Sequence, residues 1–445
     1  MEFKEYYLGE LCEIKSSKRI YAKDYVNKGI PFYRSKEIIE KSKGLDISQN
    51  LYIDNKKFEE IEEKHGIPET GDLLLTSVGT LGVPYIVKNE KFYFKDGNLT
   101  WFTNFKSLLN QYYLFYWFKS KEGIGEINRV TIGSTQKALT IKNLRYLKIT
   151  LPDKKNQFKI INLIQKIENK LENNKQVIAN LEELSQTLFK RWFVDFEFPD
   201  ENGNPYKSSG GEMIDSELGE IPEGWKIGHF SHFCKKPIAG DWGKEQKQGN
   251  YVKAVRVIRG ADINDYSKGG KGKSPIRFIL QKNFDNKKLI SGDIIVEISG
   301  GSPTQSTGRT LLINNKVLKN SEYELVCTNF CKVIRPVDEK FGEWLAYYFN
   351  YLYFRDVFFN YENGTTGIKN LDYKSVMNTM KIIAPSTQIL NNFHNLISKY
   401  KINIQYLGME NNYLTQLRDT LLPKLMSGEL EIPDDIEVNE DELSI

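Results

Sequence analysis

The sequence predicts an α+β protein in which two mixed α/β globular domains are separated by two long antiparallel coiled-coil helices. Three observations support this fold class: an internal repeat over nearly the whole chain, a heptad pattern in the second half of each copy, and short strand-like runs in the first half. Because both copies join one domain to one helix, antiparallel packing of the helices would relate the copies by a pseudo-twofold axis.

The internal repeat consists of short segments that recur in the same order. The segment at 71–75 reads GDLLL and the one at 292–296 reads GDIIV, while GST at 133–135 is matched by GTT at 364–366. From Pro152 and Pro385 onward, the spacing between equivalent positions stays at 233 residues. Each copy therefore joins a globular half of variable length to a helical half of fixed length.

The helical halves carry apolar residues at alternating steps of three and four, which favours a coiled coil. The seams contain Ile160, Ile164, Ile167, Leu171, Asn174, Ile178, Leu181, Ser185 and Leu188 in the first copy, and Phe393, Ile397, Tyr400, Ile404, Leu407, Asn411, Leu414, Arg418 and Leu421 in the second. Asn174 and Asn411 are of the kind that can fix the register of a coiled coil. The first helix is expected at about 154–192, and Gly408 is expected to weaken the second.

Short apolar runs between Gly, Asn and Asp predict strands in both globular halves, each followed by a helix whose aromatic stripe we expect in the core. The strands are expected at 73–75, 84–87, 92–94, 251–258, 294–298, 311–313 and 330–334, and the helices at 111–118 and 344–354. The chain then divides into a globular domain at 1–152, a long helix at 153–194, a turn-rich connector at 195–224, a second domain at 225–385, a second long helix at 386–428 and an acidic tail at 429–445.

The composition excludes several classes of protein. Hydrophobic residues make up 40% and aromatic residues 13% of the 445 residues, which is too apolar for a largely disordered chain. No window holds about 18 uninterrupted apolar residues, so no membrane span is expected. The first residues lack the layout of a secretion signal, and we therefore expect a cytoplasmic protein.

The acidic residues are concentrated near the C-terminus, where eight Asp and Glu and no Lys or Arg occur between Glu429 and Glu442. Removing these eight from the 58 acids leaves 50 against 62 Lys and Arg, so the rest of the chain is moderately basic. A basic body is compatible with a polyanionic partner, and the acidic tail is expected to stay solvated.

The motifs of common catalytic and cofactor sites are absent from the sequence. There is no Gly-x4-Gly-Lys-Ser/Thr loop, no His-Glu-x2-His and no Asn/Asp-Pro-Pro-Tyr/Phe motif of amino-methyltransferases. Two groups, Cys327 with Cys331 and His229 with His232 and Cys234, lack the second ligand pair that a tetrahedral zinc ion needs. We therefore predict buried, reduced cysteines, no metal or cofactor and no catalytic residue.

Polar and basic residues gather at matching places in the two copies and predict a DNA-binding surface. Glycines let a backbone approach phosphate, hydroxyls bond its oxygens, and Arg, Lys and Gln read base edges. The candidates are Lys15, Ser17, Lys18, Arg19, Tyr33, Arg34, Ser77, Thr80, Ser134, Thr135, Gln136 and Lys137 in the first copy, and Lys235, Trp242, Lys244, Arg256, Arg259, Lys271, Lys273, Ser302, Thr304, Gln305, Arg309, Thr365 and Thr366 in the second. A basic glycine loop at 268–273 occurs only in the second copy. Each of these residues, taken alone, could equally lie in a solvated loop. The prediction of a DNA-binding surface rests on their recurrence at matching places in both copies.

Longer motifs give the chain a resemblance to the specificity subunits of type I restriction–modification systems. The most specific are LFKRWFVDF at 188–196 and SELGEIPEGW at 216–225. Weaker markers are GDLLL at 71–75 with GTLG at 79–82, GSTQ at 133–136, and LPKLMSGEL at 422–430. The chain departs from the family pattern at 301–304, where GSPT replaces Gly-Thr-apolar-Gly.

The resemblance implies two target-recognition domains that each read half of a split double-stranded DNA site, with the paired helices as the spacer between them. It also implies two adenine-N6 methyltransferase subunits docked on the helices, together with restriction–translocase subunits. Methyl donor, ATP and magnesium would then belong to these partners, and the chain itself would be non-catalytic, with no membrane partner. Since the domains differ, we expect an asymmetric bipartite target whose non-specific spacer is about half to one turn of duplex, one turn being roughly 34–36 Å.

Two other functions are compatible with parts of the sequence. A self-contained DNA methyltransferase fused to its own reader is disfavoured by the missing donor-binding and base-gripping motifs. A tandem glycan- or protein-binding scaffold would use the many aromatic residues as platforms.

Overall fold

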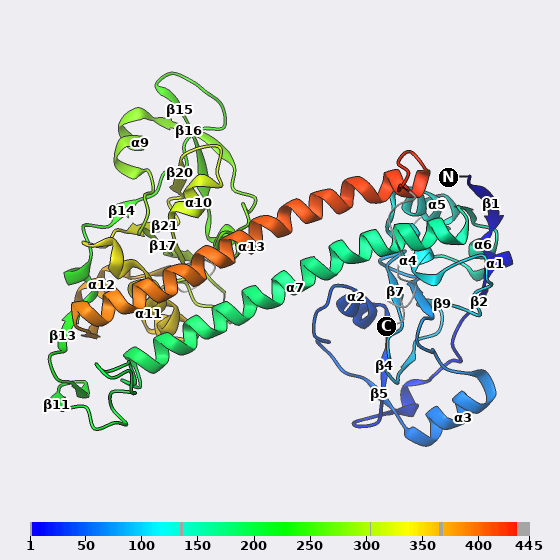
Figure 1. The fold of residues 1–445 in the computed structure, drawn as a ribbon, viewed down its shortest axis with the longest axis horizontal. Coiled ribbons are helices and arrows are strands. Elements are labelled where there is room, and N and C mark those ends of the chain that lie inside the picture. The colour runs from blue at the N-terminus through cyan, green and yellow to red at the C-terminus, as the bar shows by residue number, and fades with distance from the viewer. Residues whose placement is uncertain (1, 134–136, 303, 365–367, 434–445) are drawn as a thin grey trace. The chain divides into compact units, whose positions relative to one another are not determined.

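The computed structural model describes residues 2–133, 137–302, 304–364 and 368–433. The chain forms two compact units, one of residues 1–170 and 414–445 and the other of residues 171–413. Each unit contains a globular part, a part of each long helix and a core of its own (Figure 1). None of the helices in the described part of the chain is long and apolar enough to cross a membrane.

The globular part of unit 1 contains two four-stranded sheets and a two-stranded ladder. The sheets have the orders β2 (Glu13–Lys15), β9 (Leu99–Thr103), β6 (Leu73–Thr76), β7 (Pro84–Ile86) and β3 (Tyr25–Val26), β5 (Tyr52–Ile53), β4 (Ile30–Tyr33), β8 (Tyr93–Phe94). The ladder pairs β1 (Lys4–Tyr7) antiparallel with β10 (Lys148–Leu151). The helices are α1 (Leu8–Leu11), α2 (Ser35–Ser42), α3 (Asn55–His65), α4 (Gln111–Lys119), α5 (Lys121–Val130) and α6 (Ile141–Arg145), with a 3-10 turn at Ala22–Asp24.

The core of unit 1 is centred on α4. Its Trp117 and Phe118 are buried in one cluster with Ile164 of the first long helix, α7 (Lys154–Phe193), and Leu425 of the second, α13 (Thr387–Ser427). The aromatic stripe of α4 is therefore core, as predicted, and it packs the beginning of α7 and the end of α13 onto the globular part.

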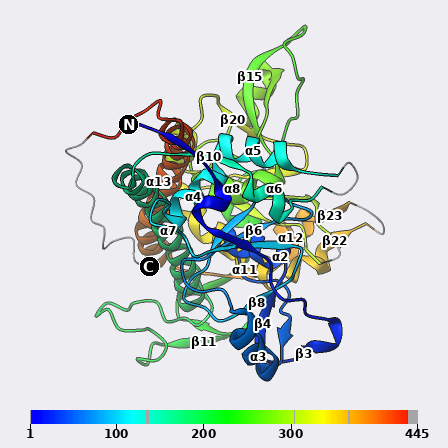
Figure 2. The ribbon, with the colours of Figure 1, turned by 90° about the vertical axis from the view of Figure 1, so that its right-hand side faces the viewer.

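Unit 2 is built from more and shorter sheets. These are β14 (Ile238–Ala239), β21 (Cys331–Ile334), β17 (Ile294–Glu297), β19 (Thr310–Leu312); β16 (Ile276–Leu280), β15 (Tyr251–Ile258), β20 (Leu325–Cys327); β18 (Ser299–Gly300), β23 (Lys369–Leu371), β22 (Glu362–Asn363); and the pairs β13 (Lys226–His229) with β24 (Lys381–Ala384) and β11 (Met213–Ser216) with β12 (Gly219–Pro222). The helices are α8 (Ile263–Ser267), α9 (Gln281–Lys287), α10 (Asn315–Lys319), α11 (Gly342–Phe354) and α12 (Tyr373–Thr379), with 3-10 turns at Phe230–Phe233, Gly260–Asp262, Glu339–Phe341 and Val357–Tyr361. The green β15 region projects from its unit in both views (Figures 1 and 2).

Aromatic rings form much of the core of unit 2. Phe193 at the end of α7 packs edge-on against Phe393 of α13, with ring centroids 4.9 Å apart, and both belong to the cluster that contains Trp344 of α11. The connector joins this core, because Phe198 stacks on Trp225 at 5.1 Å and on Tyr206 at 4.6 Å. The connector is therefore more ordered than its turn-rich composition predicts.

Each long helix begins in the same way. In unit 1, the ladder strand β10 is followed by Pro152 and then by the capping residue Asp153. In unit 2, the ladder strand β24 is followed by Pro385 and then by the capping residue Ser386. The Asp153 side chain accepts the N–H of Asn156 at 2.8 Å, and the Ser386 hydroxyl accepts the N–H of Ile389 at 3.5 Å. These side chains satisfy N–H groups that the first turn of a helix leaves free.

The Gly-Asp motif of the repeat has one structural role in both units. Gly71 and Gly292 adopt φ values of +94° and +87°, which favour glycine. The following aspartates, Asp72 and Asp293, close the turn by accepting the N–H three residues earlier, at 3.0 and 2.9 Å. The recurrence of this motif therefore reflects a turn that leads into the central strands β6 and β17.

The predicted seams are buried or half-buried along both long helices. Asn174 is 1% exposed, and its side-chain amide donates to the Asn411 carbonyl at 3.0 Å and to the Glu410 carboxylate at 2.6 Å. In unit 1, Arg418 of α13 lies 3.8 Å from Glu168 of α7. Within each unit, α7 and α13 therefore contact each other with opposite chain directions.

Gly408, expected to weaken the second helix, does not interrupt it, since α13 runs through this residue. A Cβ atom at this position would lie 1.7 Å from the Lys268 carbonyl oxygen and 2.8 Å from the Cα of Gly269. Glycine in a helix costs about 1 kcal/mol relative to alanine, and here it permits a close approach of the 268–269 backbone that any side chain would prevent.

The predicted strands are confirmed with shifts of one or two residues at their ends. The strand expected at 330–334 begins at Cys331, because Phe330 lies in the turn after β20 and is 57% exposed. All four cysteines are buried and none forms a disulfide, as predicted. Burial raises the pKa of Cys331 to about 12. Across the described ranges, no group of three His, Cys, Asp or Glu is placed to hold a metal ion.

His394 of α13 should make the stability of unit 2 depend on pH. Its Nδ1 lies 2.8 Å from the Glu343 carboxylate of α11, and this hydrogen bond raises the pKa of His394 against the opposing effect of burial. The stabilisation is complete below the unfolded-state pKa of about 6.5 and is lost as the pH rises through the folded-state pKa. We expect the difference in unfolding free energy between the wild type and His394→Gln to shrink from pH 6 to pH 9 in denaturant titrations. A constant difference would contradict this linkage.

The Asn174–Asn411 hydrogen bond gives a second test. Asn174→Ala should lower the free energy of unfolding by roughly 1–3 kcal/mol, because Asn411 loses a partner within a half-buried seam. The double variant Asn174→Leu/Asn411→Leu should recover part of this loss, since both asparagines are removed while Glu410 still loses the Asn174 amide. Urea denaturation measures both effects, and exposed Asn173→Ala is the matched control, expected within about 0.5 kcal/mol of the wild type.

Candidate nucleic-acid interface

In unit 1, two of the predicted clusters lie against each other although they are far apart in the sequence. The loop after β6 and the segment before α6 are joined by a β-bridge between Val78 and Ala138, and the Leu139 N–H donates to the Ser77 carbonyl at 2.9 Å. Thr80 and Lys137 are both exposed on these joined segments. Ser134, Thr135 and Gln136 lie outside the described residues.

Ser77 has a structural role in this arrangement. It is 2% exposed, and its hydroxyl lies 2.6 Å from the Thr100 hydroxyl and 3.2 Å from the Leu75 carbonyl. A contact between this side chain and DNA would require it to leave the core, whereas Thr80 is free of that constraint. Thr80 is therefore the more suitable phosphate contact of the two.

The basic run after β2 is fixed to β8. Ser17 is buried and its hydroxyl donates to the Phe94 carbonyl at 2.8 Å, while the Lys18 N–H donates to the Tyr93 hydroxyl at 2.7 Å. Arg19 pairs with Asp96 at 2.8 Å, yet its side chain is 64% exposed. Lys15 lies over the Trp101 ring at 4.0 Å. The run therefore has an anchored backbone and presents the exposed side chains of Lys18 and Arg19.

Tyr33 and Arg34 lie in a less accessible part of unit 1. Tyr33 stacks on Phe92 with centroids 4.7 Å apart, and burial raises its pKa to about 12. The Arg34 guanidinium donates to the Glu37 carboxylate at 2.6 Å, and that carboxylate also accepts the Arg34 N–H. Arg34 thus stabilises the beginning of α2, and Tyr33 is buried, which weighs against direct base reading by Tyr33.

Unit 2 repeats the arrangement of loop and hairpin. The loop after β17 begins with β18, which pairs antiparallel with β23, and β23 pairs with β22. Ser302 is half-buried on this loop, and Thr304 and Gln305 are exposed. Thr365 and Thr366, which come between β22 and β23 in the sequence, lie outside the described residues, as does Pro303.

Two side chains of the unit 2 loop, the half-buried Arg309 and the exposed Gln305, have hydrogen-bond partners within the unit. Arg309 donates twice to the Glu297 carboxylate, at 2.6 and 2.8 Å, and this pairing raises the pKa of Arg309. The Gln305 amide donates to the Tyr353 hydroxyl at 3.1 Å. Both residues line a cavity of about 470 Å³ that also borders Lys401 of α13. Arg309 therefore stabilises the loop, and Thr304 is the better placed to contact a ligand.

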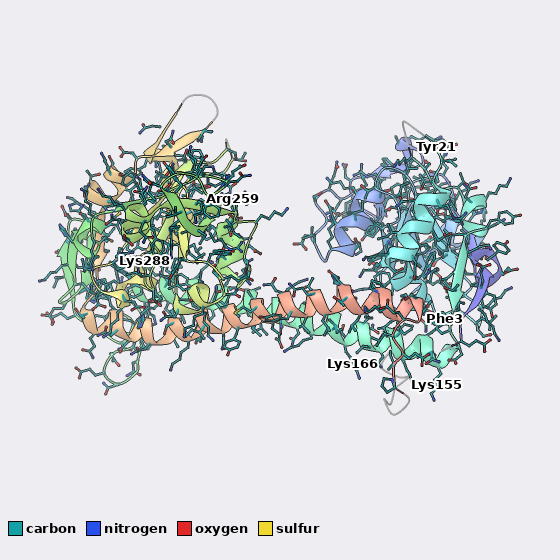
Figure 3. The ribbon with its side chains drawn as sticks, turned by 90° about the horizontal axis from the view of Figure 1, so that it is seen from above. Phe3, Tyr21, Lys155, Lys166, Arg259 and Lys288 are labelled. Atoms are coloured by element: carbon teal, nitrogen blue, oxygen red, sulfur yellow. The ribbon has the colours of Figure 1, made fainter. Side chains whose placement is uncertain are left out.

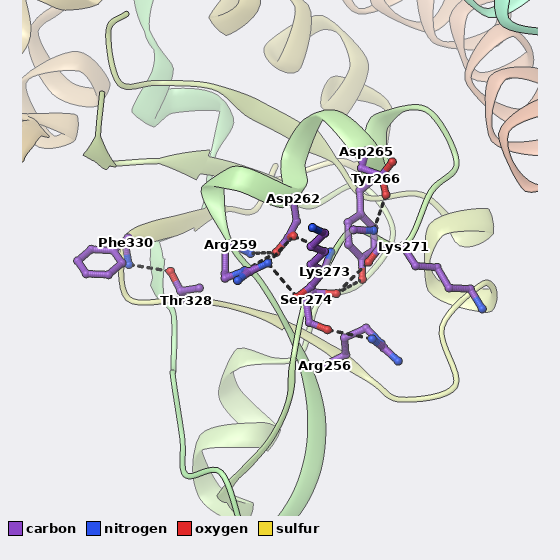
Figure 4. Close-up of polar contacts among 11 residues, drawn as sticks. Arg256, Arg259, Asp262, Asp265, Tyr266, Lys271, Lys273, Ser274, Thr328 and Phe330 are labelled. Atoms are coloured by element: carbon purple, nitrogen blue, oxygen red, sulfur yellow. Dashed lines mark hydrogen bonds and ion pairs between the residues drawn. The ribbon is translucent and has the colours of Figure 1, made fainter. Parts of the chain in front are cut away.

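Arg256 and Arg259 belong to a polar network beneath the basic glycine loop (Figure 4). The Arg259 guanidinium donates to both Asp262 carboxylate oxygens at 2.8 and 2.9 Å, and Arg256 donates to the Ser274 carbonyl at 2.9 Å. Burial alone would raise the pKa of Asp262, but the hydrogen bonds from Arg259 and from the Lys273 N–H outweigh it and hold that pKa below its ordinary value. The carboxylate is therefore ionised and fixes this network.

The remaining candidates of unit 2 are exposed cations and one ring. Lys271 and Lys273 are exposed; the backbone of Lys273 belongs to this network, and Lys271 extends away from it (Figure 4). Lys235 is exposed between the 3-10 turn at Phe230–Phe233 and β14, and Lys244 lies 5.7 Å from the Tyr251 ring. Trp242, 36% exposed, is covered by the Arg277 guanidinium at 4.2 Å.

The sequence reasoning missed three side chains of suitable chemistry, of which Tyr21 and Phe330 are exposed, whereas the Arg277 side chain is only 11% exposed. Arg277 stacks on Trp242 and pairs with Glu245 at 2.9 Å. Tyr21, 58% exposed, lies at the surface of unit 1, where Figure 3 labels it, and Phe330 is exposed in unit 2. An exposed aromatic residue after a basic run was the signal for Tyr21, whereas Arg277 sits on a strand, β16, that the sequence did not predict.

Comparison with known proteins agrees with this architecture. Residues 1–183 match the family model of the type I restriction modification DNA specificity domain. A putative type I restriction enzyme specificity subunit of Haemophilus influenzae is 32% identical over 163 residues, which cover 36% of this chain and 39% of that protein. The chain thus spans about two fifths of that relative.

Longer alignments extend the likeness over both units. The type I restriction enzyme MjaIX specificity subunit of Methanocaldococcus jannaschii is 26% identical over 380 residues, covering 81% of this chain and 78% of that one. The crystal structure of a type I restriction–modification S subunit from M. genitalium shares the fold, with a TM-score of 0.60 at 14% identity over 98% of this chain and 97% of that one. Residues 1–183 are thus similar to the DNA specificity domain, and most of the chain is similar to type I restriction–modification specificity subunits.

Proposed function

We propose that this protein is the non-catalytic DNA-recognition subunit of a type I restriction–modification enzyme. In this role it binds an asymmetric bipartite site in double-stranded DNA and positions two adenine-N6 methyltransferase subunits, together with restriction–translocase subunits, on that site. Methyl donor, ATP and magnesium would be held by those partners. Because the protein would bind DNA inside the cell, its proposed location is the cytoplasm.

One observation carries the proposal. In both units, the central strand leads into a loop rich in Gly, Ser and Thr, and that loop pairs with a segment that precedes the long helix, through Val78 and Ala138 in unit 1 and through β18 and β23 in unit 2. Two equivalent polar surfaces with different side chains suit two different half-sites.

The proposal includes the coiled coil, the pseudo-twofold relation of the copies and the division of the chain at 152, 194, 224, 385 and 428. The heptad seam and the Asn174–Asn411 hydrogen bond support a helix pair in one register. At 1.5 Å per residue, the 40 residues of α7 extend roughly 60 Å, long enough to set a spacing of one turn of duplex.

Salt dependence tests DNA recognition directly. The complex with its methyltransferase partner should bind one split sequence with an affinity that falls steeply as salt is raised, because phosphate contacts release counterions. Fluorescence anisotropy with a duplex carrying the methylated motif, found by genome-wide adenine methylation mapping, measures this slope. Binding of glycans with no salt-dependent DNA binding would instead favour a glycan scaffold, and methyl transfer by the isolated chain would favour a fused methyltransferase.

Domain exchange tests whether each recognition domain reads its own half-site. Replacing residues 1–152 by the equivalent domain of a relative should change one half-site and leave the other half-site and the spacer length as they were, because each surface is built within its own unit. Methylation mapping of cells that carry the exchanged chain reads both half-sites at once. A change in both half-sites would contradict the modular arrangement.

A further inference from the structure

The basic turn at 268–273 presents two lysines that nothing in the described parts of unit 2 neutralises. Lys271 and Lys273 are exposed, and neither forms an ion pair with a described residue. The two nearest acids in the network, Asp262 and Asp265, are occupied by the backbone of the turn itself. Asp262 accepts the Lys273 N–H at 2.9 Å, and Asp265 accepts the Gly272 N–H (Figure 4).

The glycines of this turn allow its backbone to fold tightly. Gly269 and Gly272 have φ values of +82° and +55°, and a Cβ on Gly270 would lie 2.3 Å from the Asp265 carboxylate. Because the turn is folded tightly around these two carboxylates, its lysines are held on a rigid support. The free side chains therefore point outward from a fixed backbone.

The same turn is bound to the second long helix. Gln405 of α13 is 3% exposed, and its amide donates to the carbonyls of Tyr266 at 2.8 Å and Ser267 at 3.1 Å. Asn412 of α13 donates to the Gly269 carbonyl at 3.3 Å. Gly408 lies between Gln405 and Asn412 in the sequence, and its lack of a side chain lets the Lys268 backbone approach the helix. Three residues of one helix thus fix the position of the turn along α13.

We propose that Lys271 and Lys273 bind the phosphate backbone of the target duplex and that Gln405, Gly408 and Asn412 act as positioning residues for this contact. This inference rests on the proposed function and adds a division of roles to it. The contact carries no base information, and its fixed place on the helix sets the register of the DNA on the second recognition domain. The first copy has no equivalent loop, so this contact should set the register of the DNA at the second half-site only.

The lysines are tested first, in the full complex with the methyltransferase partner. Lys271→Gln/Lys273→Gln should weaken binding to target and random duplexes by the same factor, roughly tenfold or more at 0.1 M salt, and should reduce the slope of log affinity against log salt by about 1.8 for two phosphates. The matched control is Lys226→Gln/Lys374→Gln, which removes two exposed charges from β13 and α12 of the same unit and should change neither quantity.

Three results separate the possibilities. Loss of affinity for the target alone would mean that the lysines read bases, and an unchanged slope would mean that they touch no phosphate; either overturns the inference. If the wild-type complex itself shows no salt-dependent binding, the proposed function fails instead.

The helix contact is tested by spacer length. Gly408→Ala should let the complex methylate duplexes whose spacer is one base pair longer or shorter, with discrimination against them falling at least severalfold, while recognition of the first half-site stays unchanged. Gly125→Ala, also within a helix but with open space around its Cβ, is the control and should keep full discrimination. If Gly408→Ala prevents folding, Asn412→Ala removes only the hydrogen bond to Gly269 and should show a weaker effect of the same kind. Full spacer discrimination in every folded variant would overturn the positioning role.

Discussion

A two-stranded ladder ties each globular part to the beginning of a long helix, and the rest of each unit depends on this junction. β10 pairs with β1 in unit 1, and β24 pairs with β13 in unit 2. The helix begins three residues after the ladder ends, across a proline and a capping side chain, so its direction is set by sheet hydrogen bonds. Loops elsewhere in the domain can change in length without altering that junction, which explains why the repeat keeps a fixed spacing only after Pro152 and Pro385.

The charged residues of unit 2 fall into two groups with different roles. Arg259, Arg309 and Arg335 each donate twice to a buried carboxylate, and such forked pairs fix loops and turns. Breaking one would leave an unpaired buried charge, which is costly. The exposed lysines are not used in this way. A basic sequence cluster is therefore a mixture of structural arginines and free lysines, and only the second group is available to a polyanion.

The loop at 268–273 is packed closely on α13. In unit 2 the turn that carries Lys271 and Lys273 is bound to the helix through Gln405 and Asn412 and through the absence of a side chain at Gly408. Gly408 lowers the helix propensity of α13 but leaves room for the backbone of residues 268–269. The same logic applies to Gly71 and Gly292, whose positive φ angles shape the turns before the central strands.

The sequence alone determined the α+β class, the strands at 73–75 and 251–258, the aromatic core helices and the span of α7, because local periodicity and turn residues depend on neighbours within the chain. It also determined that Asn174 and Asn411 lie in the seams. Only tertiary structure decided that these two asparagines meet, that Ser77 and Tyr33 are buried while Thr80 is exposed, and that Arg309 faces Glu297. Burial and pairing depend on residues far away in the sequence, and a polar side chain has the same local pattern whether it holds a loop in place or faces a ligand.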